Sequence, residues 1–379
     1  MLVSISSPLE STLIFSGIFL LVLLFTIRRR KIDSWFPASL TTELKGLAIL
    51  MIVWSHIGYF LVNDHRFLWP LTIMAGVGVN LFLFLSGYGL AASQLAKNLT
   101  IKQFYQRRLL KLFTPFWLML ITFLSLDFFV LHINRTGSYI GKSFLGIFTR
   151  ADLYQDINSP LWYITFIIAY YLIFPLVFSK KNPWLSAVIL YLVGYLLIWW
   201  NPAALENVIH LYKLHIVAFP LGVLVAGIII KLKNPEVLEK WSRTWRAPFY
   251  YLGLIGLLAV FVYANIYSGI GVSANLEQIM STVAILALVG IFILKKIDFK
   301  LFYWFGLYSY EIYLFHWPLM YRYDFIYRFL PSNLEWVAVI LYLGVFMGLA
   351  WVMSRVSNFI LDYFSKKPVK VVETYVEKK

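Results

Sequence analysis

The sequence predicts an all-α, polytopic membrane protein with about eleven transmembrane helices. Of its 379 residues, 61% are hydrophobic and only 13% are charged, whereas a soluble domain has about 45–50% apolar and about 25% charged residues. The mean hydropathy of +0.76 excludes a soluble globular chain and an intrinsically disordered one. The third observation is a series of long apolar segments, separated by short polar spacers.

A transmembrane helix needs about 20 mostly apolar residues to cross about 30 Å of hydrocarbon. The segments that meet this condition lie at about residues 11–27, 44–62, 68–93, 112–132, 160–178, 184–200, 212–230, 247–267, 276–294, 301–321 and 335–358. The longest spacer, 133–159, is polar and predicts an exposed loop or a short re-entrant piece. We therefore expect an N-terminal helix with a basic loop (1–43), a ten-helix core (44–358) and a basic tail (359–379).

The distribution of Lys and Arg predicts the orientation of these helices. No Lys or Arg precedes the first segment and four follow it at residues 28–31, which is the reverse of a signal peptide. When the chain is threaded alternately, 24 of the 33 Lys and Arg residues share the side of residues 28–31 and seven lie opposite. Because cytoplasmic loops accumulate these residues, we expect a plasma-membrane protein with its N-terminus outside and its C-terminus in the cytoplasm.

Composition also limits the chemistry. The chain has no Cys, which excludes disulfides, thiolate metal sites and cysteine nucleophiles. Its six His residues are dispersed, so we expect no metal site. We attribute the net charge of +15 to membrane topology and expect no nucleic-acid partner. No internal repeat supports an inverted-repeat transporter, and nothing in the sequence indicates an oligomeric state.

Ionisable side chains inside apolar segments are costly and face the interior of a helix bundle, so each is a functional candidate. Five qualify, namely Lys45, His56, Asp127, Glu311 and His316. Lys45 and His56 are eleven residues apart, close to three helical turns, so they share one face with about 16 Å between them along the axis. Lys45 then lies at the cytoplasmic boundary, and His56 lies inside the membrane.

A partner for His56 is predicted in the tenth segment. Glu311 lies about 15 Å above the inner end of that segment, a height similar to that of His56. A carboxylate beside His56 would hold its tautomer and favour its protonated form. Glu311 and His316 are five residues apart and do not share a face. The pattern fits equally a structural histidine at 56 and an interfacial polar residue at 316.

Two further runs carry polar groups. Small residues in the third segment predict close helix approach, and Ser86 among them fits a packing serine better than a nucleophile. Arg107, Arg108 and Lys111 follow on the cytoplasmic side, where Arg108 and Lys111 share a helix face. Such a cluster suits the phosphates of a polyanion, and the positive-inside bias produces it as well.

Taken in order, these motifs resemble those of the membrane acyltransferase-3 family over about residues 44–358. The family's Arg-x10-His corresponds to Lys45-x10-His56, with lysine in place of arginine, which keeps the charge but loses the bidentate fork. The other matching runs are Phe82-Leu-Phe84-Leu-Ser86-Gly87-Tyr88, Arg108-x-x-Lys111 before Pro115, Leu161-Trp162-Tyr163, and Ser309-Tyr310-x-x-Tyr313-x-x-His316-x-Pro318.

The resemblance implies an O-acyltransferase of extracytoplasmic glycans. Its donor substrate would be acyl-CoA, with acetyl as the default acyl group, and no permanently bound cofactor is expected. The inner-face cations would hold the CoA phosphates, because phosphates cannot enter hydrocarbon cheaply; they are Lys45, Arg107, Arg108 and Lys111. His56 would act as general base on the acceptor hydroxyl or carry the acyl group covalently.

The remaining residues would line the substrates. The predicted lining residues are Tyr59, Ser86, Trp162, Tyr163, Ser309 and Tyr313. Of these, Ser309, Tyr313 or Trp162 would donate to the oxyanion of the thioester, while Glu311 and His316 remain catalytic candidates. The expected partners are acyl-CoA, a glycan or glycolipid acceptor, and the lipid bilayer.

Two alternatives stay open. One is a polytopic exporter or flippase of a glycan or lipid-linked sugar, because an aromatic-rich bundle with a buried histidine suits that role too. The other is an inactive scaffold on the same fold. Dependence of the product on an acyl donor separates the enzyme from both alternatives.

Overall fold

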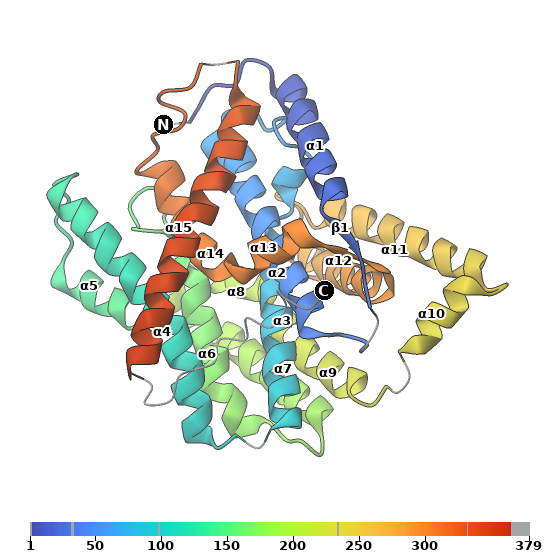
Figure 1. Cartoon of the computed structure of the whole chain (residues 1–379). Coiled ribbons are helices and arrows are strands. Elements are labelled where there is room, and N and C mark those ends of the chain that lie inside the picture. Colours follow the sequence, from blue (N-terminus) through green and yellow to red (C-terminus); the bar gives the residue numbers. More distant parts are fainter. Residues whose placement is uncertain (1, 32–33, 98, 233–234, 332, 365–379) are drawn as a thin grey trace.

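The computed structural model confirms an all-α polytopic fold (Figure 1). It describes residues 2–31, 34–97, 99–232, 235–331 and 333–364. Within these residues, ten helical spans are long and apolar enough to cross a membrane. They are α1 (Pro8–Phe25), α2 (Ala38–Ser55), α3 (Ala75–Ala96), α4 (Ile101–Phe129), α6 (Trp162–Val177), α7 (Pro183–Trp200), the consecutive α8 (Ile209–His215) and α9 (Ala218–Ile229), α11 (Ala247–Tyr267), α12 (Ala274–Leu294) and α15 (Glu335–Phe364).

The tenth predicted segment, 301–321, is not one helix. It is divided at Tyr308 into α13 (Lys300–Leu307) and α14 (Ser309–Tyr321). At the division, the Ser309 hydroxyl donates to the carbonyl of Gly306 at 3.1 Å, so a side chain supplies a hydrogen bond where the helical ladder is interrupted. Hydropathy registers the apolar length of a segment but not such a local break, which explains the expectation of eleven continuous helices.

Short elements connect the spans. The predicted loop 133–159 contains the helix α5 (Gly137–Phe144), which projects from one edge of the bundle in Figure 1. A second short helix, α10 (Glu236–Arg243), precedes α11. One-turn 3-10 helices lie at Leu71–Ile73, Ser159–Leu161 and Ala203–Leu205. Of the predicted basic tail, residues 365–379 lie outside the described residues, and α15 ends at Phe364.

The basic run 28–31 is ordered more tightly than a loop. Strand β1 (Ile27–Arg29) pairs antiparallel with β2 (Ile297–Phe299). The next residue, Arg30, is only 7% exposed and donates to the carbonyl of Phe292 at 2.7 Å. This bond satisfies one of the carbonyls that a helix leaves unpaired at its end, here that of α12. The chain before the ten-helix core is therefore fastened to the core.

Helix α1 packs on the part of α2 that leads to His56. The ring of Phe19 lies 4.9 Å from that of Trp54, edge to face, and the Ser11 hydroxyl donates to Glu335 at 2.9 Å. On the side of the basic loops, a buried ion pair of 2.6 Å joins Glu43 of α2 to Lys295.

Glycines set the closest helix approaches. A Cβ atom added at Gly46 of α2 would lie 1.8 Å from the Phe302 carbonyl oxygen of α13. Between α3 and α9, a Cβ at Gly87 would lie 2.1 Å from a backbone oxygen of α9, and one at Gly222 would lie 2.0 Å from the Phe84 carbonyl oxygen. The predicted close approach at the third segment is confirmed at Gly87, because only glycine lets the two backbones meet.

Replacing Gly222 by Ala tests this contact. The backbone of α3 cannot move aside without repacking, so we expect a loss of about 1–3 kcal/mol of stability. The measurement is the temperature at which the detergent-solubilised protein loses its monodisperse peak in size-exclusion chromatography.

Gly256→Ala is the matched control, because a Cβ there meets nothing within 4 Å. That variant should lose its monodisperse peak at the same temperature as the wild type or at a higher one, since alanine favours the helical state. If Gly222→Ala loses its peak at the same temperature as the wild type, the account of the α3–α9 contact is contradicted.

Candidate active site

His56 stands where α2 changes its helical form. The α-helix ends at Ser55 and continues as one π-helical turn, His56–Leu61. Within that turn, a Cβ added at Gly58 would lie 2.7 Å from the Phe67 carbonyl oxygen, so the turn packs directly on the segment that follows it. Single π-helical turns are rare and occur frequently at functional sites.

The partner of His56 is His316 of α14. The Nδ1 atom of His56 lies 2.8 Å from Nε2 of His316, and the two rings are nearly parallel with centroids 5.0 Å apart. His316 has no exposed surface, whereas His56 is only half-buried. No hydrogen bond or ion pair joins Glu311 to His56 within the described part of the chain. The predicted pairing with Glu311 is therefore corrected, because a residue five positions from His316 points away from the face that meets α2.

A backbone carbonyl decides the tautomers of this pair. Nδ1 of His316 lies 2.8 Å from the carbonyl oxygen of Tyr313, and a carbonyl only accepts, so Nδ1 of His316 carries a proton. In the neutral ring, Nε2 of His316 must then accept, and Nδ1 of His56 must donate to it. The remaining nitrogen of His56, Nε2, consequently bears a free lone pair. This assignment follows from the hydrogen-bond partners.

Aromatic rings enclose His56. Trp317 meets its imidazole edge to face with centroids 4.8 Å apart, and Phe60 lies at 5.7 Å. The predicted lining residue Tyr59 instead stacks on His65, with centroids 4.4 Å apart. Trp317 was not among the predicted lining residues, although its position directly after His316 was the available signal.

Two of the three predicted oxyanion donors already have acceptors. The hydroxyl of Tyr313 donates to the Pro160 carbonyl, and that of Ser309 donates to the Gly306 carbonyl. Either group would have to leave its carbonyl before it could serve an oxyanion. Two other predicted lining residues, Tyr163 and Ser86, lie close to each other.

The predicted basic cluster is assembled between two helices. The ammonium group of Lys45 on α2 interacts electrostatically with Arg108 and Lys111 of α4, and Lys111 also interacts with Arg107. No carboxylate in the described residues forms an ion pair with any of these four cations. Like charges that gather without an acidic partner favour binding of an anion. Lys45 and His56 lie on one continuous helical segment, α2 and the π-helical turn that extends it.

A second buried histidine was not predicted from the sequence. His215 of α8 is 4% exposed, and its Nδ1 lies 2.9 Å from Oδ1 of Asn80. Asn80 in turn donates to Ser281 at 2.8 Å, and the ring of Trp162 stacks on His215 with centroids 5.4 Å apart. The signal was the same as for His56, a histidine within an apolar segment.

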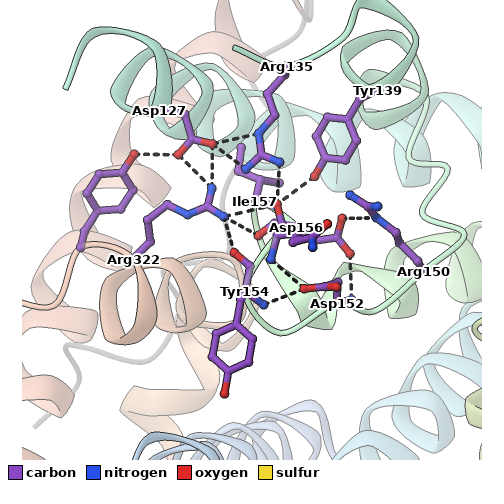
Figure 2. A network of polar contacts seen from close by, with 11 residues as sticks. Asp127, Arg135, Tyr139, Arg150, Asp152, Tyr154, Asp156, Ile157 and Arg322 are labelled. Carbon is purple, nitrogen blue, oxygen red and sulfur yellow. Dashed lines mark hydrogen bonds and ion pairs between the residues drawn. The ribbon is translucent and has the colours of Figure 1, made fainter. Parts of the chain in front are cut away.

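Asp127, the remaining predicted ionisable residue, organises the opposite end of the bundle (Figure 2). It is fully buried and accepts from Arg135 at 2.9 Å and from Arg322 at 2.7 Å, and Tyr323 donates to it as well. Arg322 directly follows α14, so this network also fixes the helix that carries His316.

Comparison with known protein families matches a model described as an acyltransferase domain, the acyltransferase-3 model, to residues 44–355. The match covers most of the chain and includes both histidines and the basic cluster, while α1 lies outside it. Searches of the curated proteins and of the solved structures returned no match. The resemblance found in the motifs is thereby confirmed, and the chain belongs to the acyltransferase-3 family of membrane acyltransferases.

Proposed function

We propose that this membrane acyltransferase moves an acyl group, with acetyl as the default, from cytosolic acyl-CoA to a hydroxyl of an extracytoplasmic glycan or glycolipid. The observation that carries the proposal is the hydrogen-bond chain from the Tyr313 carbonyl through His316 to His56. It leaves the Nε2 lone pair of His56 available, and a general base requires such a lone pair. The basic loops are taken as cytoplasmic in a plasma membrane.

The donor would bind at the basic cluster. The CoA phosphates need cations that are not already paired with carboxylates, and Lys45, Arg108 and Lys111 form no ion pair with a carboxylate of the described residues. From Lys45, the bound donor must extend about 16 Å along α2 for its thioester to reach His56. An extended pantetheine arm is the part of acyl-CoA suited to that passage.

In the direct route, Nε2 of His56 takes the proton of the acceptor hydroxyl while its oxygen attacks the thioester carbon. The carbon–sulfur bond then breaks, and the imidazolium returns the proton to the leaving thiolate. In the covalent route, Nε2 attacks the thioester carbon and the CoA thiolate leaves. The acceptor hydroxyl later displaces the acyl group from the imidazole, and its proton passes to the thiolate. His316 is a positioning residue in both routes, because it holds Nδ1 of His56.

Substitution of the two histidines tests these roles. His56→Ala should abolish ester formation, because it removes the proposed base. His316→Ala should lower the rate about 10- to 100-fold, the equivalent of one hydrogen bond to a charged group, whereas His316→Gln should restore part of it because the Gln oxygen accepts from His56. The measurement is alkali-labile acetate on the surface glycans of expressing cells, with protein amounts matched.

The amount of surface glycan distinguishes the exporter alternative. If His56→Ala cells carry normal amounts of glycan without esters, the protein is an acyltransferase. If the glycan itself disappears from the surface, export is the function and the proposal is wrong. Wild-type ester content in both histidine variants would instead favour an inactive scaffold.

If the basic cluster holds the donor, replacing its cations should weaken the binding of acetyl-CoA. Lys45→Met and Arg108→Gln should each raise the Kd for acetyl-CoA about tenfold, which corresponds to the loss of one charge-assisted contact. Lys45→Arg should retain the affinity, because it preserves the charge. Binding is measured on the purified protein by isothermal titration calorimetry.

Lys181→Gln is the control, because Lys181 is an exposed cation of the same group of loops. Its Kd should equal that of the wild type. If Lys181→Gln and Lys45→Met lose the same amount of affinity for acetyl-CoA, the donor is attracted by the net charge of the protein. That result would contradict a defined phosphate site.

A further inference from the structure

A cavity of about 120 Å³ lies between the 153–157 segment and the end of α14. Three aromatic residues line it, Tyr154, Trp317 and Tyr321, and its polar groups come from Asp156 and Arg322. Tyr321 stacks on Trp317 with centroids 4.2 Å apart. Tyr154 is 63% exposed, and Figure 2 shows its ring pointing away from the Asp127–Arg322 network. An aromatic wall with a few fixed polar groups is typical of a small-ligand site.

The network of Figure 2 makes this wall rigid. Arg322 donates to Asp127 and also to the backbone carbonyls of Tyr154 at 3.1 Å and Asp156 at 2.9 Å. Backbone N–H groups of Gln155 and Tyr154 bond to the carboxyl of Asp152 and lower its pKa. The segment is thereby held against α14 at several points, so the cavity exists before a ligand arrives, which reduces the entropy lost on binding.

The charges around the cavity are balanced. Arg322 is paired with Asp127, and Asp156 is paired with Arg150 at 2.8 Å. Neither lining charge is therefore left to attract an ion of the opposite sign. One polar group does lack a partner, because the Tyr321 hydroxyl is buried without a hydrogen bond to any described residue. A buried hydroxyl without a partner is costly, so a ligand that supplies one is favoured.

The cavity is one side chain away from His56. Trp317 lines the cavity and contacts the imidazole of His56 on its other side, with centroids 4.8 Å apart. A larger cavity of about 400 Å³ shares Asp156 but has no lining residue from α14, so it lacks this proximity. A ligand in the smaller cavity is thus the one placed beside the catalytic residue.

We propose that this cavity binds a neutral sugar ring of the acceptor, with the ring packed on the Tyr154–Trp317–Tyr321 wall and one sugar hydroxyl bonded to the Tyr321 hydroxyl. A sugar ring has apolar C–H faces and hydroxyl groups at its edge, which matches an aromatic wall with one unpaired hydroxyl. The balanced charges select against a phosphate or carboxylate ligand. This inference rests on the proposed function, and it names the substrate subsite of that reaction.

Sugar binding is measured without any acyl donor. Methyl β-glucoside, methyl β-galactoside and N-acetylglucosamine are titrated against the purified protein in nanodiscs, with saturation-transfer NMR as the readout. At least one of them should bind, and Tyr321→Phe should raise its Kd about fivefold, the value of one neutral hydrogen bond. Tyr154→Ala should raise it by a similar factor. A second arm presents the same ring on a glycolipid in the nanodisc, which separates a lipid-linked acceptor from a free glycan.

One control isolates the subsite from general surface effects. Tyr263→Phe, at an exposed position of α11, should bind like the wild type. Sugar binding by a wild-type protein that forms no ester would overturn the acyl-transfer proposal and leave the subsite standing. If no probe binds up to about 100 mM in either arm, or if Tyr321→Phe and Tyr154→Ala bind as well as the wild type, the subsite is wrong.

Discussion

One hydrogen bond, from Nδ1 of His56 to Nε2 of His316, holds the two imidazole rings of this site together. It crosses between α2 and α14 inside a helix bundle, where a polar group without a partner is costly. Its direction is not free, because the Tyr313 carbonyl accepts from His316 and so makes His316 the acceptor for His56. The carbonyl oxygen of Tyr313, three residues before His316, therefore determines which nitrogen of His56 can take a proton.

The surroundings of Lys45 and those of His56 differ in chemistry. Lys45 lies among cations without acidic partners, which suits a polyanionic donor. Beyond His56 the surroundings are aromatic, and the ionic groups there are mutually paired around Asp127 and Asp156. This asymmetry agrees with the proposed function, in which a charged donor and a glycan acceptor reach the protein from opposite sides of the membrane and neither has to cross the hydrocarbon.

The sequence predicted what depends on a single helix and missed what depends on the contact of two. The shared face of Lys45 and His56 follows from helical periodicity, and the spans follow from hydropathy. His56 pairs with His316 and not with Glu311 because of the way α14 is rotated against α2. The periodicity of a single segment carries no information about that rotation. The break at Tyr308 and the pairing of strands from the two ends of the chain likewise depend on tertiary contacts.

The protonation of His56 tests the account most directly. Solid-state NMR of the protein with labelled histidine nitrogens, assigned by loss of the signal in His56→Gln, distinguishes the two neutral tautomers. The account predicts a proton on Nδ1 and a bare Nε2 at neutral pH. A proton found on Nε2, with Nδ1 bare, would contradict it, because no lone pair would then face the substrates.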